Sequence, residues 1–299
     1  MLSQFEKYLP ELLRVLLLEQ IEIARAKLAD KSLDFNDVVH DVRTGFKKIR
    51  AYILLLRTDL GEDIYKTESR CFRDEGKGIA ELRDSHVVYS TLEQLVVNYQ
   101  DQLQNSTVNK ILKNLAIEYE TKKKLALEQD ALMNLAGRLR DNKNRIHNWI
   151  LPQDNDGSVF ERLKDRYARG AKQMRDAETN KDDEKLHNWR KNVKHLWYQV
   201  RIFEPCKPEI MTAYAESLHS LSDYLGEDHD LVVLNANLPA QHDIENKTDL
   251  NVLRDRISAE REKLQAGAFP LARSIFAESP EQFADRIAGY WRNRMQQPV

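Results

Sequence analysis

The chain has 299 residues, enough to bury a large core as one big domain or as two of ordinary size. Hydrophobic residues make up 41% of it and charged residues 31%, whereas Gly (10) and Pro (8) are scarce. This balance favours long amphipathic helices and argues against a turn-rich β-protein or a disordered chain, while the formal net charge of −2 conceals any local concentration of charge.

Two cysteines, Cys71 and Cys206, stand far apart in the sequence and outside any CxxC motif. They suggest neither a disulfide framework nor a cysteine-rich metal site, and they fit a reducing compartment. The longest early apolar run, VLLLEQIEIA, follows Arg14 and is interrupted by Glu19 and Glu22, so it fits neither a signal-peptide core nor a membrane span. We therefore expect a soluble, cytoplasmic protein.

Apolar residues recur at three- and four-residue intervals along nearly the whole chain, and no sustained alternation of period two indicates strands, so the sequence predicts an all-α fold. In the first half we expect helices at about 10–30, 36–59, 62–98, with a break at Gly76 and Gly78, and 107–147. In the second half we expect them at about 158–178, 183–203, 208–237, with a break near Gly226, and 248–295, with a break near Pro280. The stretch LPQDNDG, at 151–157, separates the two halves.

The helices expected at 36–59 and 183–203 carry similar sequences. HDVRTGFKKIRAYILLLR, which starts at His40, aligns without a gap with HNWRKNVKHLWYQVRIF, which starts at His187, 147 residues later. The same register pairs Arg43 with Arg190, Lys47 with Lys194 and, in the preceding helix, Arg25 with Lys172. A register of 146 residues pairs Asp84 with Asp230. This internal repeat predicts two pseudo-symmetric four-helix halves, 1–150 and 151–299.

Each repeated helix separates an apolar face from a basic one when it is wound at about 100° per residue. The apolar faces contain Val42, Phe46, Ile49, Ile53 and Leu56 in the first copy, and Trp189, Val193, Leu196, Val200 and Phe203 in the second. The basic faces contain His40, Arg43, Lys47 and Arg50 in the first copy, and His187, Arg190, Lys194 and Arg201 in the second.

The basic faces require an explanation, because most charged helix faces in contact with solvent mix both signs. Residues 185–203 include no Asp or Glu, and like charges at these spacings destabilise an isolated helix by roughly 0.2–0.5 kcal/mol per pair. Either protein carboxylates or a bound anion compensates. Arginine forks, lysine ammonium groups and a histidine near a helix start all suit phosphate oxygens.

At these residues the sequence resembles the CHAD family, the conserved histidine α-helical domain. Its hallmark is a duplicated helix with His, Arg three residues later and Arg or Lys seven residues later, often with a further Arg at ten. The first copy matches all four positions, and the second matches three, with Trp197 in place of the last Arg. The dipeptide RD at Arg83, LGEDHDLVVL from Leu225 and FAESPEQF from Phe276 are also similar.

The resemblance implies a pair of pseudo-symmetric four-helix bundles that enclose a basic groove or pore. It also implies binding of inorganic polyphosphate, often with targeting to polyphosphate granules. No motif in the sequence indicates a cofactor or a metal site. The residues that we expect to bind polyphosphate are Arg25, His40, Arg43, Lys47, Arg50, Lys172, His187, Arg190, Lys194 and Arg201. Arg201 follows Trp197 by one turn and would partly substitute for the missing Arg. Two cations on the last expected helix of each half could extend the site. They are Lys122 and Lys124 in the first half, and Arg261 and Lys263 in the second.

Asp84 and Asp230 have two possible roles. Each is either a helix cap or exposed carboxylate, or a residue that orients an Arg of the basic helices.

An enzymatic function is not supported by the sequence. EYETK, at 118–122, matches the ExExK string of triphosphate-cleaving tunnel enzymes, to which CHAD domains are sometimes fused. That motif needs a strand, whereas a helix turns Glu118 and Glu120 about 200° apart. The remaining histidines form no HxxxH or HExxH pair, and no Gly-rich phosphate loop or GxSxG is present. We therefore expect a binding protein without a catalytic or metal site.

Nucleic acid is the main alternative ligand, since proteins that bind single strands interleave aromatic residues with a basic track. In the first copy Phe46 belongs to the apolar face and Tyr52 lies off the basic one, whereas Trp197 and Tyr198 fall beside the basic face of the second copy. A third possibility is an adaptor whose basic groove receives an acidic protein segment.

Overall fold

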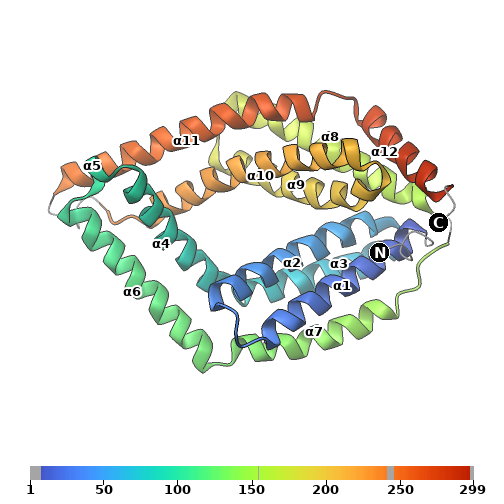
Figure 1. The fold of residues 1–299 in the computed structure, drawn as a ribbon, viewed down its shortest axis with the longest axis horizontal. Helices are drawn as coiled ribbons and strands as arrows, with labels where there is room; N and C mark the ends of the chain where they lie inside the picture. Colours follow the sequence, from blue (N-terminus) through green and yellow to red (C-terminus); the bar gives the residue numbers. More distant parts are fainter. Residues whose placement is uncertain (1–7, 154, 241–245, 297–299) are drawn as a thin grey trace.

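The computed structural model describes residues 8–153, 155–240 and 246–296, which form α-helices and one 3₁₀-helix, with no strand among them (Figure 1). The prediction of an all-α fold is confirmed. The elements are α1 (Leu9–Ala29), α2 (Phe35–Leu55), α3 (Arg57–Lys77), α4 (Ala80–Asn98), α5 (Gln100–Leu103), α6 (Ser106–Glu128), α7 (Ala131–His147), α8 (Asp156–Asn180), α9 (Asp183–Val200), the 3₁₀-helix η2 (Arg201–Cys206), α10 (Pro208–Asn237), α11 (Lys247–Ile275) and α12 (Pro280–Met295).

Most helix boundaries follow the sequence pattern. The expected break at Gly76 and Gly78 separates α3 from α4, and the break near Pro280 separates α11 from α12. A kink at Gly61, where φ is +74°, divides α3 close to the expected boundary at 59–62. One break was not predicted: α6 and α7 are separate helices, and Asp130 between them adopts a left-handed conformation with φ +48°.

The predicted break near Gly226 is wrong, because α10 runs unbroken from Pro208 to Asn237. Gly226 is helical, and a Cβ atom at this position would lie 3.8 Å from Nε of Arg190 on α9. That distance is an ordinary van der Waals contact, so Gly226 lies beside an arginine of the second basic face and does not end the helix.

The helices pack in pairs within each half of the chain, and further pairs join the two halves. Within the first half α1 packs against α2 and α7, and α4 packs against α6. Within the second half α8 packs against α9 and α12, and α10 packs against α11. The most extensive contacts between the halves are those of α2 with α9 and of α4 with α10, and α2 also packs against α8 and α6 against α11. In Figure 1, α5 lies beside α11 at one end of the molecule.

One large hydrophobic core is shared by both halves. It includes all ten apolar-face residues predicted on the repeated helices, and each of them is buried. A second, smaller core lies under α4, α5, α6, α10 and α11 and contains residues such as Leu92, Val108, Leu234 and Leu253. At the opposite end, the Asp156 carboxylate accepts hydrogen bonds from the Leu9 amide and from Nε1 of Trp291, at 2.7 Å each. The start of α8 is thereby joined to the first and the last helix.

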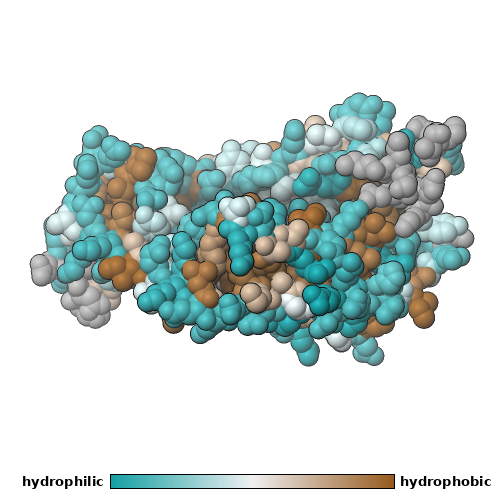
Figure 2. Space-filling model, turned by 60° about the horizontal axis from the view of Figure 1, so that its bottom comes forward, coloured by the Kyte–Doolittle hydropathy of each residue, from teal (hydrophilic) through white to brown (hydrophobic). Residues whose placement is uncertain are grey.

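Hydrophobic side chains on the surface are scattered. The face in Figure 2 is mostly hydrophilic, with separate hydrophobic patches, which is usual for a folded protein. Among the described residues, no helix has the length and the apolar character that crossing a membrane requires. Both cysteines are free and half-buried.

Candidate functional site

The two helices that carry the repeated basic faces, α2 and α9, begin in the same way. Asp34 caps α2 by accepting from the amides of Asn36 and Asp37, and Asp182 caps α9 by accepting from those of Glu184 and Lys185. An aspartate at this position satisfies amides that have no partner within the helix and favours a fixed helix start. The helices α2 and α9 pack against each other, and Lys47 of α2 lies close enough to Arg190 and Lys194 of α9 for their charges to influence it, so these parts of the two basic faces are neighbours.

Cations from three helices come together where α2 meets α9. We call this group the central basic cluster: Arg43 and Lys47 from α2, Arg83 from α4, and Arg190 and Lys194 from α9. Burial, and then the charges of the other four members, together lower the pKa of Lys47 to about 7. Burial and Arg190 likewise lower the pKa of Lys194.

Asp230 of α10 faces the central basic cluster. Burial raises the pKa of this carboxyl group, while Arg190, Arg83, Lys194 and Lys47 act in the opposite direction. Asp230 is therefore a carboxylate among cations and not an exposed helix cap. The cations outnumber it, so the cluster retains positive charge that a bound anion would neutralise.

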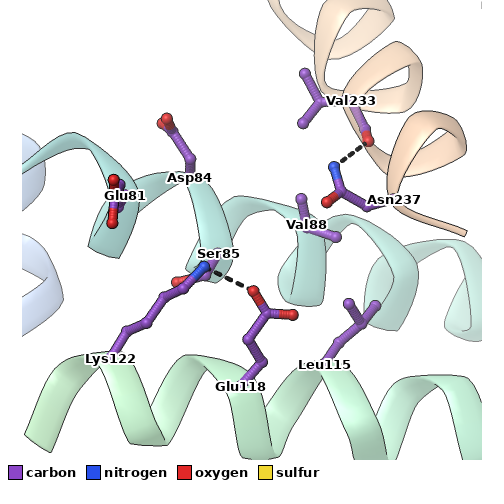
Figure 3. A pocket seen from close by; sticks show the side chains of 9 residues that line it. All are labelled: Glu81, Asp84, Ser85, Val88, Leu115, Glu118, Lys122, Val233 and Asn237. Atoms are coloured by element: carbon purple, nitrogen blue, oxygen red, sulfur yellow. Dashed lines mark hydrogen bonds and ion pairs between the residues drawn. The ribbon is translucent and has the colours of Figure 1, made fainter.

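Arg43 is held by groups from two neighbouring helices. It donates to the Gly76 carbonyl oxygen at 3.3 Å and to Oδ1 of Asp84 at 3.4 Å. Asp84 also lines a pocket of about 160 Å³ between α4, α6 and α10, together with Glu81 and Glu118. Figure 3 shows that Lys122 reaches toward this pocket from α6 and pairs with Glu118. The carboxylates make this pocket unsuited to phosphate.

Histidines flank the central basic cluster. His40 is exposed, yet partial desolvation and then Arg83 and Lys47 lower its pKa. His187 is half-buried, its pKa is lowered mainly by burial, and its ring lies 4.3 Å from that of His229, centroid to centroid. The pKa of His229 falls to about 4, chiefly through burial and then through Arg190. These imidazoles are therefore neutral near pH 7, and a neighbouring anion would favour their protonation.

Besides the flanking His40 and His187, two arginines of the predicted faces lie outside the cluster. Arg50 lies beside α3, where Arg73, Tyr65 and Asp74 are its charged or titratable neighbours. Arg201 is the first residue of η2; it pairs with Glu204 at 3.5 Å and lies 5.6 Å from the centroid of the Trp197 ring. The 3₁₀ turn begins there, so Arg201 does not continue the face of α9 as a regular α-helix would.

The predicted residues of the preceding helices also lie apart. Arg25 of α1 donates to both carboxylate oxygens of Glu22 at 3.0 Å, and Lys172 is exposed on α8. Among the described residues, neither Arg25 nor Lys172 makes a hydrogen bond or an ion pair with the central basic cluster. The four cations considered as extensions are each paired with a carboxylate: Lys122 with Glu118, Lys124 with Glu128, Lys263 with Glu260, and Arg261 with Asp228 and Asp183.

Sequence reasoning omitted Arg83 and His229 from the site. The register of 146 residues that pairs Asp84 with Asp230 also pairs Arg83 with His229, so the signal was present in the repeat. Neither residue belongs to the faces of α2 and α9, and only the packing of α4 and α10 brings them to the cluster. Within the described ranges, three or more His, Cys, Asp or Glu residues nowhere gather into a group that could hold a metal ion.

A family model for the CHAD domain matches residues 16–239, about three quarters of the chain. The chain belongs to the CHAD family. The matched CHAD region contains α2, α4, α9 and α10, and therefore the whole central basic cluster and Asp230. The tail FAESPEQF, from Phe276, lies outside it, so the CHAD match is shorter than the resemblance suggested. No curated protein matched the chain.

Proposed function

We propose that this CHAD domain binds inorganic polyphosphate through the central basic cluster and acts as a binding module rather than an enzyme. The observation that carries the proposal is the lowered pKa of Lys47, at about 7, among cations supplied by both copies of the motif. Like charges held together in a partly buried place destabilise the free protein, and a linear polyanion would relieve that repulsion. The CHAD family is commonly linked to polyphosphate, which supports the same ligand.

The binding surface that we propose is a basic groove between two pseudo-symmetric four-helix halves, 1–150 and 151–299. Equivalent helix pairings support this arrangement: α1–α2 corresponds to α8–α9, α1–α7 to α8–α12, and α4–α6 to α10–α11. The contact of α2 with α9 would then lie on the pseudo-twofold axis, and the polyanion would follow the groove across it. Binding would localise the protein to polyphosphate granules in the cytoplasm.

Polyphosphate fits the central basic cluster better than nucleic acid does. Polyphosphate has no bases and needs rows of cations without a stacking platform, whereas single-strand binders offer free aromatic faces. Trp197 lies beside the basic face, but its ring packs against Tyr198 and His219, with centroids 4.8 and 4.2 Å away. Tyr198 is buried. We keep RNA, and an acidic protein segment, as alternative ligands that the experiment must separate.

The two aspartates have different roles in this proposal. Asp84 orients Arg43 toward the groove through the 3.4 Å contact. Asp230 limits the repulsion among Arg83, Arg190 and the two lysines while the site is empty.

Titration with long-chain polyphosphate tests the proposal. We expect the Arg43→Ala/Arg190→Ala variant to lose affinity and the Lys124→Ala variant, altered at an exposed site on α6, to keep it. The wild-type affinity should fall steeply with salt, with a log–log slope of about −0.7 per phosphate contact if single-stranded nucleic acid is a fair analogue. Undiminished affinity in the double variant would mean that another surface binds the ligand.

Competition at equal phosphate concentration separates the alternatives. If RNA or an acidic peptide displaces long-chain polyphosphate, the preferred ligand is wrong.

A further inference from the structure

A second basic pocket lies among α2, α3, α8 and α9. Its volume is about 220 Å³, and its lining includes Arg50, Arg166, Arg169, Lys191 and His195. Among the described residues that line it, none is Asp or Glu. We call it the lateral pocket.

The lateral pocket is distinct from the central basic cluster because α9 presents a different face to each. Lys191 and His195 follow Arg190 and Lys194 by one residue, which turns them about 100° around the helix. Their charged neighbours differ accordingly. Burial and then Arg166 and Arg50 lower the pKa of His195 to about 3, whereas Lys194 is influenced by Arg190 and Arg83.

Buried polar atoms without partners surround the lateral pocket. Nε of Arg50, Nε of Arg166 and Nδ1 of His195 are buried and make no hydrogen bond in the structure. Buried polar groups are nearly always paired, and an unpaired one costs roughly 1–3 kcal/mol. These three nitrogen atoms come from three different helices and belong to residues that line one basic pocket, as does Oε1 of Gln173, a fourth buried atom without a partner. The nitrogens indicate that the pocket suits a polar ligand that accepts hydrogen bonds.

Arg166 is fixed in place before any ligand arrives. Its Nη1 donates to Oδ1 of Asn192 on α9, and Nδ2 of Asn192 donates to the Arg166 carbonyl oxygen at 3.1 Å. This reciprocal pairing leaves less side-chain freedom to be lost on binding.

The lateral pocket is not a feature of the sequence repeat. The register of 147 residues places Glu19, Glu22 and Thr44 at the positions of Arg166, Arg169 and Lys191. In that half Glu22 pairs with Arg25 and Lys143. The first half therefore lacks an equivalent basic pocket, and the repeat alone does not account for the lateral pocket, although Arg50 in its lining is the fourth position of the first motif.

We infer that the lateral pocket binds a compact phosphate group with free terminal oxygens. Arginines from both α2 and α8 line the pocket, and their planar guanidinium donors suit phosphate oxygens. The pocket is large enough for pyrophosphate, since a single water occupies roughly 30 Å³ of liquid volume. The ligand is either free orthophosphate or pyrophosphate, or the terminal phosphate of a polyphosphate chain. The inference goes beyond the function proposed for the central basic cluster and does not depend on it.

Calorimetric titration with pyrophosphate at low salt tests the lateral pocket. The test variant is Arg169→Gln/Lys191→Gln, because both residues are exposed and their loss should leave the fold intact. The control is Arg175→Gln/Lys207→Gln, which removes the same charge from exposed positions outside the pocket. We expect pyrophosphate to bind the wild type and the control equally, and the test variant about tenfold or more weakly.

A second arm separates the two sources of phosphate and the two sites. Pyrophosphate binding that survives Arg43→Ala/Arg190→Ala supports a free phosphate ligand in a pocket independent of the central basic cluster. If pyrophosphate does not bind, but the test variant has a lower affinity for short polyphosphate chains than the wild type, the ligand is the chain end. If the test variant binds both pyrophosphate and short polyphosphate chains as the wild type does, the inference is wrong. This conclusion holds whether or not long-chain polyphosphate binds to the central basic cluster.

Discussion

Lys194 on α9 lies close enough to Lys47 on α2 for its charge to lower the pKa of Lys47. Burial contributes most to this shift, and Lys194 contributes most among the charged neighbours. The two lysines occupy equivalent positions in the two copies of the motif. The repeat thus brings like charges together at a partly buried place, which lowers the stability of the free protein.

We predict that affinity for long-chain polyphosphate falls as the pH rises above about 7. Lys47 has a pKa of about 7 in the free protein, and a bound polyanion raises it. Above pH 7 the complex therefore holds more protons than the free protein, so each further rise in pH weakens binding until the pKa in the complex is reached. Dissociation constants from about pH 6 to pH 9 at constant ionic strength, with proton uptake measured in two buffers, test this.

The Lys47→Arg variant serves as the control for that experiment, since arginine stays protonated throughout the range. Its profile should be flatter than that of the wild type. A flat wild-type profile would show that Lys47 does not titrate on binding.

We predict that Lys47→Met stabilises the protein while it weakens binding. The lysine pKa drops from 10.5 to about 7 on folding, so below pH 7 the residue is charged in both states and the folded state bears the full penalty of the buried charge. Between about pH 7 and 10 the unfolded state binds more protons, and the wild type regains stability as the pH rises. Methionine keeps the length without the charge, and the free energy of unfolding at pH 7 should rise by roughly 1–3 kcal/mol.

Urea unfolding at two pH values measures this effect. The advantage of Lys47→Met should shrink near pH 10, where the wild-type lysine is neutral when folded. Lys124→Met, at an exposed site, should leave stability nearly unchanged. Equal free energies of unfolding for Lys47→Met and the wild type at pH 7 would mean that the lysine charge does not destabilise the folded protein.

The sequence predicted most of the fold because nearly every helix has a regular apolar face. The same periodicity placed Arg43, Lys47, Arg190 and Lys194 on the basic faces, and the structure brings these four together. It could not predict that Arg50 faces away from them, because that depends on where α3 and α8 pack against α2.

The lateral pocket could not be predicted for a related reason. Its cations come from α2, α8 and α9, and of these only Arg50 belongs to a basic face that the sequence pattern identified. Only tertiary packing makes them neighbours, and the repeat register hides them because Glu19 and Glu22 occupy the positions of Arg166 and Arg169 in the first half.

We predict that Asp84→Ala lowers polyphosphate affinity with little effect on stability. The Arg43 side chain is 18% exposed and that of Asp84 is 61% exposed, so their contact adds little to the folding free energy, about 0.5 kcal/mol or less. Without Asp84, Arg43 keeps its bond to the Gly76 carbonyl oxygen but loses its second anchor. We expect affinity to fall by roughly two- to fivefold, as 0.5–1 kcal/mol of lost positioning would produce.

Glu81→Gln provides the matched control, because Glu81 is exposed on the same helix and lies in the same acidic pocket as Asp84. Its affinity should not decrease. If Asp84→Ala leaves both affinity and stability unchanged, its role in positioning Arg43 must be abandoned.

We predict that Gly170→Ala on α8 destabilises the protein and disturbs the lateral pocket. A Cβ atom there would lie 2.7 Å from Cζ of Phe276 and 2.9 Å from Nδ2 of Asn192. The Phe276 ring is buried against Tyr167, and Asn192 is paired with Arg166, so neither can yield without disrupting other contacts. Overpacking of this kind typically costs about 1–3 kcal/mol.

The matched control is Gly137→Ala, because Gly137 is exposed on α7 and a Cβ atom there would meet nothing within 4 Å. Alanine in an exposed helix is favoured over glycine by up to about 1 kcal/mol, so this variant should be more stable than the wild type. Denaturation midpoints that shift in opposite directions for the two variants would support the close packing of α8 against α9 and Phe276. A Gly170→Ala variant as stable as the wild type, with unaltered pyrophosphate binding, would show that α8 can move and that Asn192 does not hold Arg166 in place.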